Sequence, residues 1–140
     1  MKKVFAILLS MAFLFSVAGC GNSPEVKIED VEINYGTSSL YSREDMDAAI
    51  QVILKEFNTT LLGSKLYSIS YSSDDECDEK NITRMTEVEM KKGGKEIEVF
   101  TQCIMFRCDF EVPGGTRAGR MPWWLARTDG GEWRFIERGY

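Results

Sequence analysis

Histidine is missing from all 140 residues of the chain. Its absence excludes Ser-His-Asp and Cys-His catalysis, zinc sites with histidine ligands, and switching by imidazole protonation. Basic residues are also in the minority, with 17 Lys and Arg against 22 Asp and Glu and a net charge of −5. A surface of this sign argues against nucleic acid as a partner, because phosphate contacts need clustered lysine and arginine. The chain also lacks an internal repeat, a domain boundary and a glycine-rich phosphate loop before a helix.

Residues 1–19 are typical of a lipoprotein signal peptide. Two lysines follow the first methionine, and residues 4–17 form an apolar run broken only by two serines. This run has the length of a secretory core and is short for a membrane span. The sequence VAGC at 17–20 follows and resembles the bacterial lipobox. The resemblance implies cleavage between Gly19 and Cys20 and attachment of diacylglycerol to the Cys20 thiol.

Lipid attachment at Cys20 predicts a protein held at the extracytoplasmic face of the cell membrane. Buried acyl chains contribute ~0.8 kcal/mol per methylene, so two or more chains keep a protein on a membrane. Loss of the two leader lysines from the 17 basic residues leaves 15 against 22 acidic ones, a net charge of −7. Residues 20–34 are then the lipidated N-terminus, a tether and a weak first strand. The alternatives are an ordinary secretory peptide with an incidental Cys20, or an uncleaved membrane anchor.

One amphipathic helix is predicted over residues 43–61. Ser42 supplies an N-cap, and Glu44 and Asp45 place negative charge in the first turn, where the helix dipole favours it. The apolar residues recur at intervals of three and four and form one stripe, namely Met46, Ile50, Ile53, Leu54, Phe57 and Leu61. We therefore expect the helix to pack by one face.

After this helix, apolar and polar side chains alternate with a period of two, which predicts strands. The predicted strands are 66–71, 84–90, 96–111, 121–128 and 132–138. A polar, acid-rich loop at 72–80 and a hairpin turn at 92–95 separate the first three. Because 96–111 is unusually long, we expect it to bend or bulge. Residues 35–140 are thus predicted to form one α+β domain, with one long amphipathic helix packed in a curved antiparallel sheet of four to six strands.

The end of the chain, residues 123–140, carries the pattern W-x-L-x-R, a turn, and G-x-W with a final G-Y. This pattern resembles the closing hairpin of nuclear-transport-factor-two-like domains, whose fold is a cystatin-like roll. Together with the helix start at Ser42 and the Tyr-Ser-Ser-Asp step at 71–74, it is similar to small lipoproteins of clostridial-type bacteria. The resemblance covers residues 35–140 and implies a fold and a cellular location, but no established activity.

Three cysteines in the folded part depart from the usual pattern of these lipoproteins: Cys77, Cys103 and Cys108. An odd number leaves at least one thiol free unless it pairs between chains. Cys103 and Cys108 lie five residues apart in one predicted strand, so they point to opposite faces and cannot bridge without a bulge. A disulfide from Cys77 to either of them stays open, as does burial of all three as small apolar side chains.

Three residues are the candidates for ligand binding, namely Tyr71, Gln102 and Trp124. Gln102 lies among apolar neighbours on the predicted inner face, where its amide needs hydrogen-bond partners. It either lines a pocket with Tyr67 or Tyr71, or a bulge turns it outward. Trp123 and Trp124 are adjacent in a strand and point to opposite faces, so one of them leaves the core or enters a pocket.

Two charged features have structural interpretations. Arg127 and Glu137 lie on the two predicted strands of the last hairpin, which favours a cross-strand ion pair. The run 74–79 holds five carboxylates, but its spacing fits no EF-hand, so a solvated loop is favoured over a metal site. No pair of carboxylates stands out as an acid-base site against this acidic background.

These features favour a noncatalytic module that binds a small molecule, a peptide or another envelope protein while its lipid holds it on the membrane. No catalytic residue, metal or cofactor is expected. One alternative is an enzyme that uses a pocket of the same roll, with Tyr, Asp or Glu as the proton-transfer group. The other alternative is a structural subunit that forms a homodimer sheet to sheet.

Overall fold

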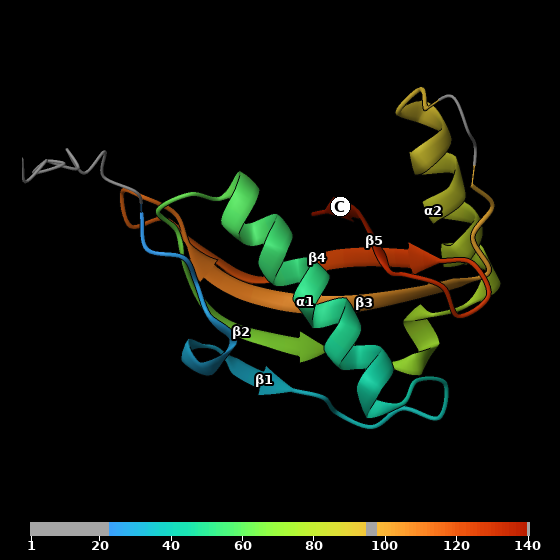
Figure 1. Cartoon of the computed structure of the whole chain (residues 1–140), viewed down its shortest axis with the longest axis horizontal. Helices are drawn as coiled ribbons and strands as arrows, with labels where there is room; N and C mark the ends of the chain where they lie inside the picture. Colours follow the sequence, from blue (N-terminus) through green and yellow to red (C-terminus); the bar gives the residue numbers. More distant parts are fainter. Residues whose placement is uncertain (1–22, 95–97, 140) are drawn as a thin grey trace, which may run out of the picture.

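The computed structural model describes residues 23–94 and 98–139. Its strands form one open sheet in chain order, with the bounds β1 Glu32–Asn34, β2 Lys65–Tyr71, β3 Gln102–Glu111, β4 Arg117–Arg127 and β5 Arg134–Arg138. The helices in this part of the chain are α1 Arg43–Thr60 and α2 Glu79–Lys91, with short 3-10 turns η1 Ile28–Asp30 and η2 Asp74–Glu76. α1 lies across one face of the sheet, and α2 stands at one end of it (Figure 1). The predicted α+β class is confirmed.

The sheet is mixed, so the prediction of a purely antiparallel sheet was wrong. β1 pairs with β2 in parallel, and the other three pairs of neighbouring strands are antiparallel. α1 connects β1 to β2, and a helical crossover of this kind returns the chain in its original direction. The weak first strand predicted within residues 20–34 is short and covers only Glu32–Asn34.

The start of α1 agrees with the predicted cap. The Ser42 hydroxyl accepts from the Asp45 amide at 3.1 Å, and the Asp45 carboxylate accepts from the Ser42 amide at 3.1 Å. This reciprocal pair is a capping box, which satisfies two amides that the first turn leaves without helical partners. The predicted apolar stripe faces the sheet, and the Phe57 ring lies 5.6 Å from the Phe110 ring of β3. The main core therefore lies between α1 and the sheet.

α2 replaces the strand that the sequence predicted over 84–90. The Asp78 carboxylate caps the helix by accepting from the Asn81 amide at 2.9 Å. Ile82, Met85 and Val88 recur every three residues, and Met85 is completely buried. A helix starting at Asp78 brings these side chains to one face, whereas a strand would divide them between two.

The predicted hairpin turn at 92–95 is also wrong, because this segment ends α2. The Gly93 amide donates to the Met90 carbonyl at 3.3 Å, and Gly93 has a φ of +76°, which favours glycine after a helix. Lys95 itself lies outside the described residues. The predicted loop at 72–80 contains η2 and the first residues of α2.

Bulges shift the faces of two central strands. In β2 the register changes between Leu66 and Ser68, so Leu66 is buried in place of Tyr67. The predicted irregularity of the long strand is confirmed by a register change between Cys108 and Phe110. That strand, β3, begins at Gln102 and not at 96.

The opposite face of the sheet carries a second buried group of side chains. The Cys103 thiol donates to the Glu76 carbonyl of η2 at 3.7 Å, and the Arg84 guanidinium of α2 lies 4.7 Å from the Trp124 ring. α2 also reaches the edge strand β5, where the Lys92 ammonium donates to the Ile136 carbonyl at 2.6 Å. η2 and α2 thus cover one end of this face.

Candidate functional site

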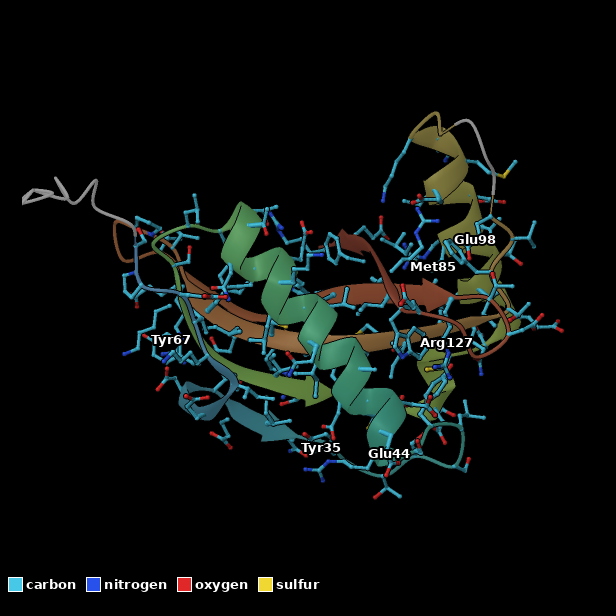
Figure 2. All side chains as sticks on the ribbon, viewed as in Figure 1. Tyr35, Glu44, Tyr67, Met85, Glu98 and Arg127 are labelled. Carbon is cyan, nitrogen blue, oxygen red and sulfur yellow. The ribbon has the colours of Figure 1, made fainter. Side chains whose placement is uncertain are left out.

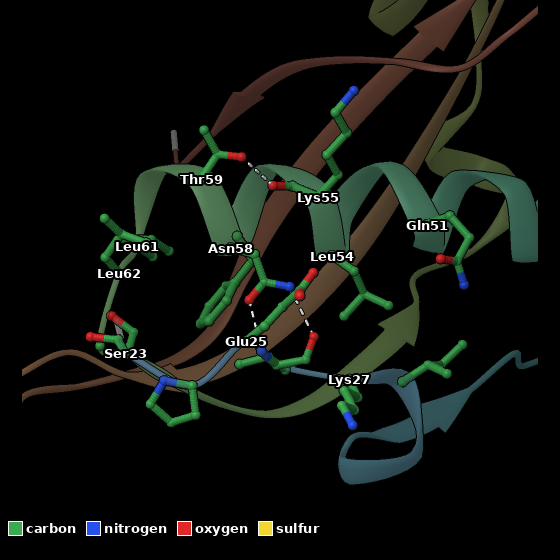
Figure 3. A pocket seen from close by; sticks show the side chains of 16 residues that line it. Ser23, Glu25, Lys27, Gln51, Leu54, Lys55, Asn58, Thr59, Leu61 and Leu62 are labelled. Carbon is green, nitrogen blue, oxygen red and sulfur yellow. Dashed lines mark hydrogen bonds between the residues drawn. The ribbon is translucent and has the colours of Figure 1, made fainter. Parts of the chain in front are cut away.

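A groove of about 800 Å³ runs between the second half of α1 and the segment 23–28 (Figure 3). Its apolar floor is formed by Leu54 and Phe57 of α1 and by Leu61 after it, and Leu62 lies at one end. Its rim is polar and carries charges of both signs, with Glu25, Lys27, Gln51, Lys55 and Thr59. The groove therefore offers apolar contact and hydrogen-bonding groups side by side.

The wall opposite α1 is fixed by one side chain. The Asn58 Oδ1 accepts from the Val26 amide at 2.8 Å, and the Asn58 Nδ2 donates to the Val26 carbonyl at 2.9 Å (Figure 3). The turn below the groove is tight, because a Cβ at Gly63 would lie 3.3 Å from Pro113 and 3.4 Å from Ser23. Leu62 beside this turn is 67% exposed. An apolar side chain thus stands in solvent at the end of the groove next to Ser23.

Tyr71 lies outside this groove, and its hydroxyl is bonded to Asp74. The Tyr71 hydroxyl donates to Asp74 Oδ1 at 2.7 Å, and the Ser39 amide and hydroxyl donate to Asp74 Oδ2 at 2.7 and 2.8 Å. The Ser38 hydroxyl donates to Oδ1 as well. The pKa of Asp74 is held well below its usual range, first by Ser38, then by the Ser39 amide and Tyr71. Burial, followed by the Asp74 hydrogen bond, raises the pKa of Tyr71.

All three cysteines of the described residues are buried and unpaired. The Cys77 thiol lies 3.6 Å from the Tyr71 hydroxyl, and the neighbouring Cys103 thiol is the first cause of a lowered pKa at Cys77. The same thiol pair, together with burial, raises the pKa of Cys103. Burial alone raises the pKa of Cys108, which lies on the opposite face from Cys103 as predicted. Cys77 is therefore the most acidic of the three thiols.

Gln102 does not line this groove, and the register of β3 and β4 shows no bulge beside it. Its Oε1 accepts from the Arg127 Nε at 2.7 Å and from the Gly130 amide at 3.2 Å. Figure 2 places Arg127 and Tyr67 at opposite ends of the sheet, so the predicted pairing of Gln102 with Tyr67 is wrong. The amide instead orients Arg127 and holds the turn before β5.

The predicted ion pair between Arg127 and Glu137 is also wrong. The Arg127 guanidinium pairs with Asp45 of α1 at 2.8 Å and lies 4.2 Å from the Trp133 ring. Glu137 pairs with Arg84 on the other side of the sheet. The last residue of β4 that pairs with β5 is Ala126, opposite Arg134, so Arg127 lies beyond the paired part of the β4–β5 hairpin, although it still pairs with Gln102 of β3.

Trp124 lies on the face opposite α1, and its neighbour Trp123 is fully buried against α1, as the alternation predicted. Trp124 lines a hollow of about 330 Å³ with six other residues, namely Glu76, Arg84, Met105, Arg107, Pro122 and Gly139. The three sequence candidates are thus not brought together. The sequence interpretation missed Arg84 because its segment was assigned to a strand, and it missed Arg107 because nothing local distinguishes it from a solvated arginine.

The predicted signal peptide 1–19 and the predicted processing site at Gly19 and Cys20 lie outside the described residues. Within residues 23–94 and 98–139, neither helix is long and apolar enough to cross a membrane. The same residues hold no group of three or more Cys, Asp or Glu side chains arranged to bind a metal ion. Comparison of the chain with models of protein families, with curated protein sequences and with solved structures finds no match.

Proposed function

We propose that this protein is a lipoprotein anchored at the extracytoplasmic face of the cell membrane by diacylglycerol on Cys20. The support is the sequence of the leader: a positive start, an apolar core of secretory length, and VAGC at its end. Ser23, which follows Cys20 closely, lines the groove beside α1. The groove of such a lipoprotein opens close to the lipid surface.

The tethered domain is a noncatalytic binding module, and the groove beside α1 is its binding site. The observation that carries this proposal is the groove itself, because about 800 Å³ lies within the range of small-molecule sites. An apolar floor of Leu54, Phe57 and Leu61 under a polar rim suits a small amphipathic molecule. The proposal includes a cystatin-like roll, which is supported by the bulged β2 and β3 and by α1 packed across β3.

A pocket enzyme has less support. The best proton-transfer candidates, Tyr71 and Asp74, bond each other outside the groove, and the shifts of their pKa values keep Tyr71 neutral and Asp74 ionised near neutral pH. A general acid or base needs a pKa close to the working pH. A sheet-packing dimer also has less support, because Asp109 and Arg117 form an ion pair on the face away from α1.

Lipid attachment is tested by replacing Cys20 with alanine. The wild-type protein is expected to fractionate with membranes and to carry the mass of diacylglycerol on a chain that begins at Cys20. Cys20→Ala is expected to lose both properties, and Ser23→Ala, a matched change beyond the processing site, is expected to keep both. A mature chain that begins at Cys20 with an unmodified thiol would overturn the anchor.

The groove is tested by placing a photo-reactive amino acid at Gln51, on its rim, and at Glu44, an exposed position of α1 outside it. In cells that make the lipidated protein, irradiation is expected to add a small-molecule mass at 51 and not at 44. Thr59→Trp fills the groove and is expected to abolish the adduct, while Thr60→Trp, exposed and outside the lining, keeps it. Equal labelling at both positions would refute the groove as the binding site.

A further inference from the structure

The hollow beside Trp124 is separate from the groove, because α1 and the hollow lie on opposite faces of the sheet. Apolar residues of β3 and β4 form its floor, namely Met105, Pro122 and Trp124, and Arg107 of β3 lies opposite Pro122 in the sheet. Glu76 of η2 and Arg84 of α2 stand at its sides. The floor is mainly apolar and the walls are charged.

One of its two arginines is already neutralised. Arg84 forms an ion pair with Glu137, and its guanidinium lies 4.7 Å from the Trp124 ring. The Arg84 guanidinium is held in place, because its charge is paired with Glu137 and its flat face packs on the Trp124 ring. Arg84 therefore shapes the hollow and adds little net charge to it.

Arg107 and Glu76 have no such partners. Within the described residues, neither side chain takes part in an ion pair, with each other or with a third group. Arg107 is half-buried, and so is Glu76. A ligand group of opposite sign stabilises a half-buried charge that has no partner, because solvent and salt screen such a site less than they screen the open surface. The hollow thus presents one positive and one negative group above an apolar floor.

We propose that this hollow binds the zwitterion of an apolar α-amino acid. Arg107 takes the carboxylate through the paired donors of its guanidinium, and Glu76 takes the ammonium group. The side chain of the ligand packs on Met105, Pro122 and Trp124. A volume of about 330 Å³ is at the small end of ligand sites, as a single amino acid requires. A simple anion or a simple cation would satisfy only one of the two charges.

The test uses L-phenylalanine and two analogues that each lack one charge: 3-phenylpropionate without the ammonium group, and phenethylamine without the carboxylate. Calorimetric titration of the full lipidated protein is expected to show saturable binding of phenylalanine and binding about tenfold or more weaker for each analogue. Arg107→Gln and Glu76→Gln are each expected to weaken phenylalanine binding to a similar degree. Near-ultraviolet circular dichroism establishes that both variants are folded.

The same two variants also separate the contact to the carboxylate from the contact to the ammonium group. In Arg107→Gln the carboxylate has no partner, so phenylalanine and phenethylamine are expected to bind equally; in Glu76→Gln the same holds for phenylalanine and 3-phenylpropionate. Arg120→Gln and Asp75→Asn, exposed changes outside the lining, keep wild-type binding. Absence of saturable phenylalanine binding to folded protein would overturn the proposal. So would an analogue that binds the wild type as tightly as phenylalanine does, or an unchanged affinity for phenylalanine in Arg107→Gln.

Discussion

The carboxamide of Asn58 bonds both backbone groups of Val26, a residue 32 positions earlier in the chain, at 2.8 and 2.9 Å. This pairing holds the segment before β1 against α1, much as a strand holds its neighbour.

Replacing Asn58 by alanine is expected to release the segment 23–28. Loss of the two hydrogen bonds is expected to lower the free energy of unfolding by about 1 to 2 kcal/mol and to open a protease site near Val26. Thr59→Ala is the control, because it removes one bond to the Lys55 carbonyl within the helix. Denaturant unfolding and limited proteolysis measure both effects. Equal protease resistance of Asn58→Ala and Thr59→Ala would contradict the clamp.

Replacing Met85 by alanine tests the assignment of α2. The side chain is completely buried, so the cavity is expected to cost about 2 to 5 kcal/mol. Met90 on the same helix is 49% exposed. Met90→Ala is therefore expected to change the free energy of unfolding by about 0.5 kcal/mol or less. Similar losses in the two variants, measured by urea unfolding, would show that Met85 does not face the sheet.

Asp74 makes the fold sensitive to acid. The hydroxyl of Ser38, the Ser39 amide and Tyr71 hold its pKa below the value of an unfolded aspartate. A carboxylate of this kind stabilises the fold above its unfolded pKa, near 3.9 in a typical peptide, and the contribution is lost as the pH falls toward its folded pKa. The free energy of unfolding is expected to decline between roughly pH 5 and pH 2.

Asp74→Asn should make that decline shallower, because the titrating group is gone. Asp75→Asn, a change at the exposed neighbour, is expected to keep the wild-type slope. Chemical unfolding at a series of pH values gives the slopes directly. If Asp74→Asn and the wild type lose stability in parallel, the Asp74 hydrogen bonds do not control the acid response.

Thiol reactivity is expected to follow pKa and burial. Cys77 has a lowered pKa and is 8% exposed, whereas Cys103 and Cys108 have raised pKa values and are completely buried. In a Cys20→Ala background, an aromatic disulfide reagent should therefore label one thiol in the native protein and the other two only on unfolding. A native labelling phase that survives Cys77→Ser would contradict this order.

The helix start at Ser42 could be predicted because its signals are local. The cap, the acidic first turn and the apolar stripe all lie within residues 42–61, and no partner is needed to recognise them. α2 was missed because Val88 and Met90 alternate with glutamates and imitate a strand. Asp78, the cap of α2, lies in the stretch 72–80 that its charge assigned to a loop, and Ile82 lies between that loop and the predicted strand at 84–90.

The candidate sites were harder to predict, since they depend on which face a strand presents. A bulge of one residue in β2 moves Tyr67 away from the core, and the sequence does not mark its position. Arg127 pairs with Asp45 only because α1 begins beside the end of β4, and it bonds Gln102 because the two residues lie opposite each other in β3 and β4. Arg107 of β3 and Glu76 of η2 line the same hollow only because tertiary packing brings η2 beside β3.

The bond from the Lys92 ammonium to the Ile136 carbonyl blocks part of an outer edge of the sheet. β5 is an outer strand of the sheet, and exposed outer strands are where chains add to one another and grow into fibrils. The ammonium group occupies an acceptor that an incoming chain would need, and Arg134 of the same strand is engaged by Glu89 at 2.7 Å. Copies of this chain are thereby hindered from adding to the sheet along β5.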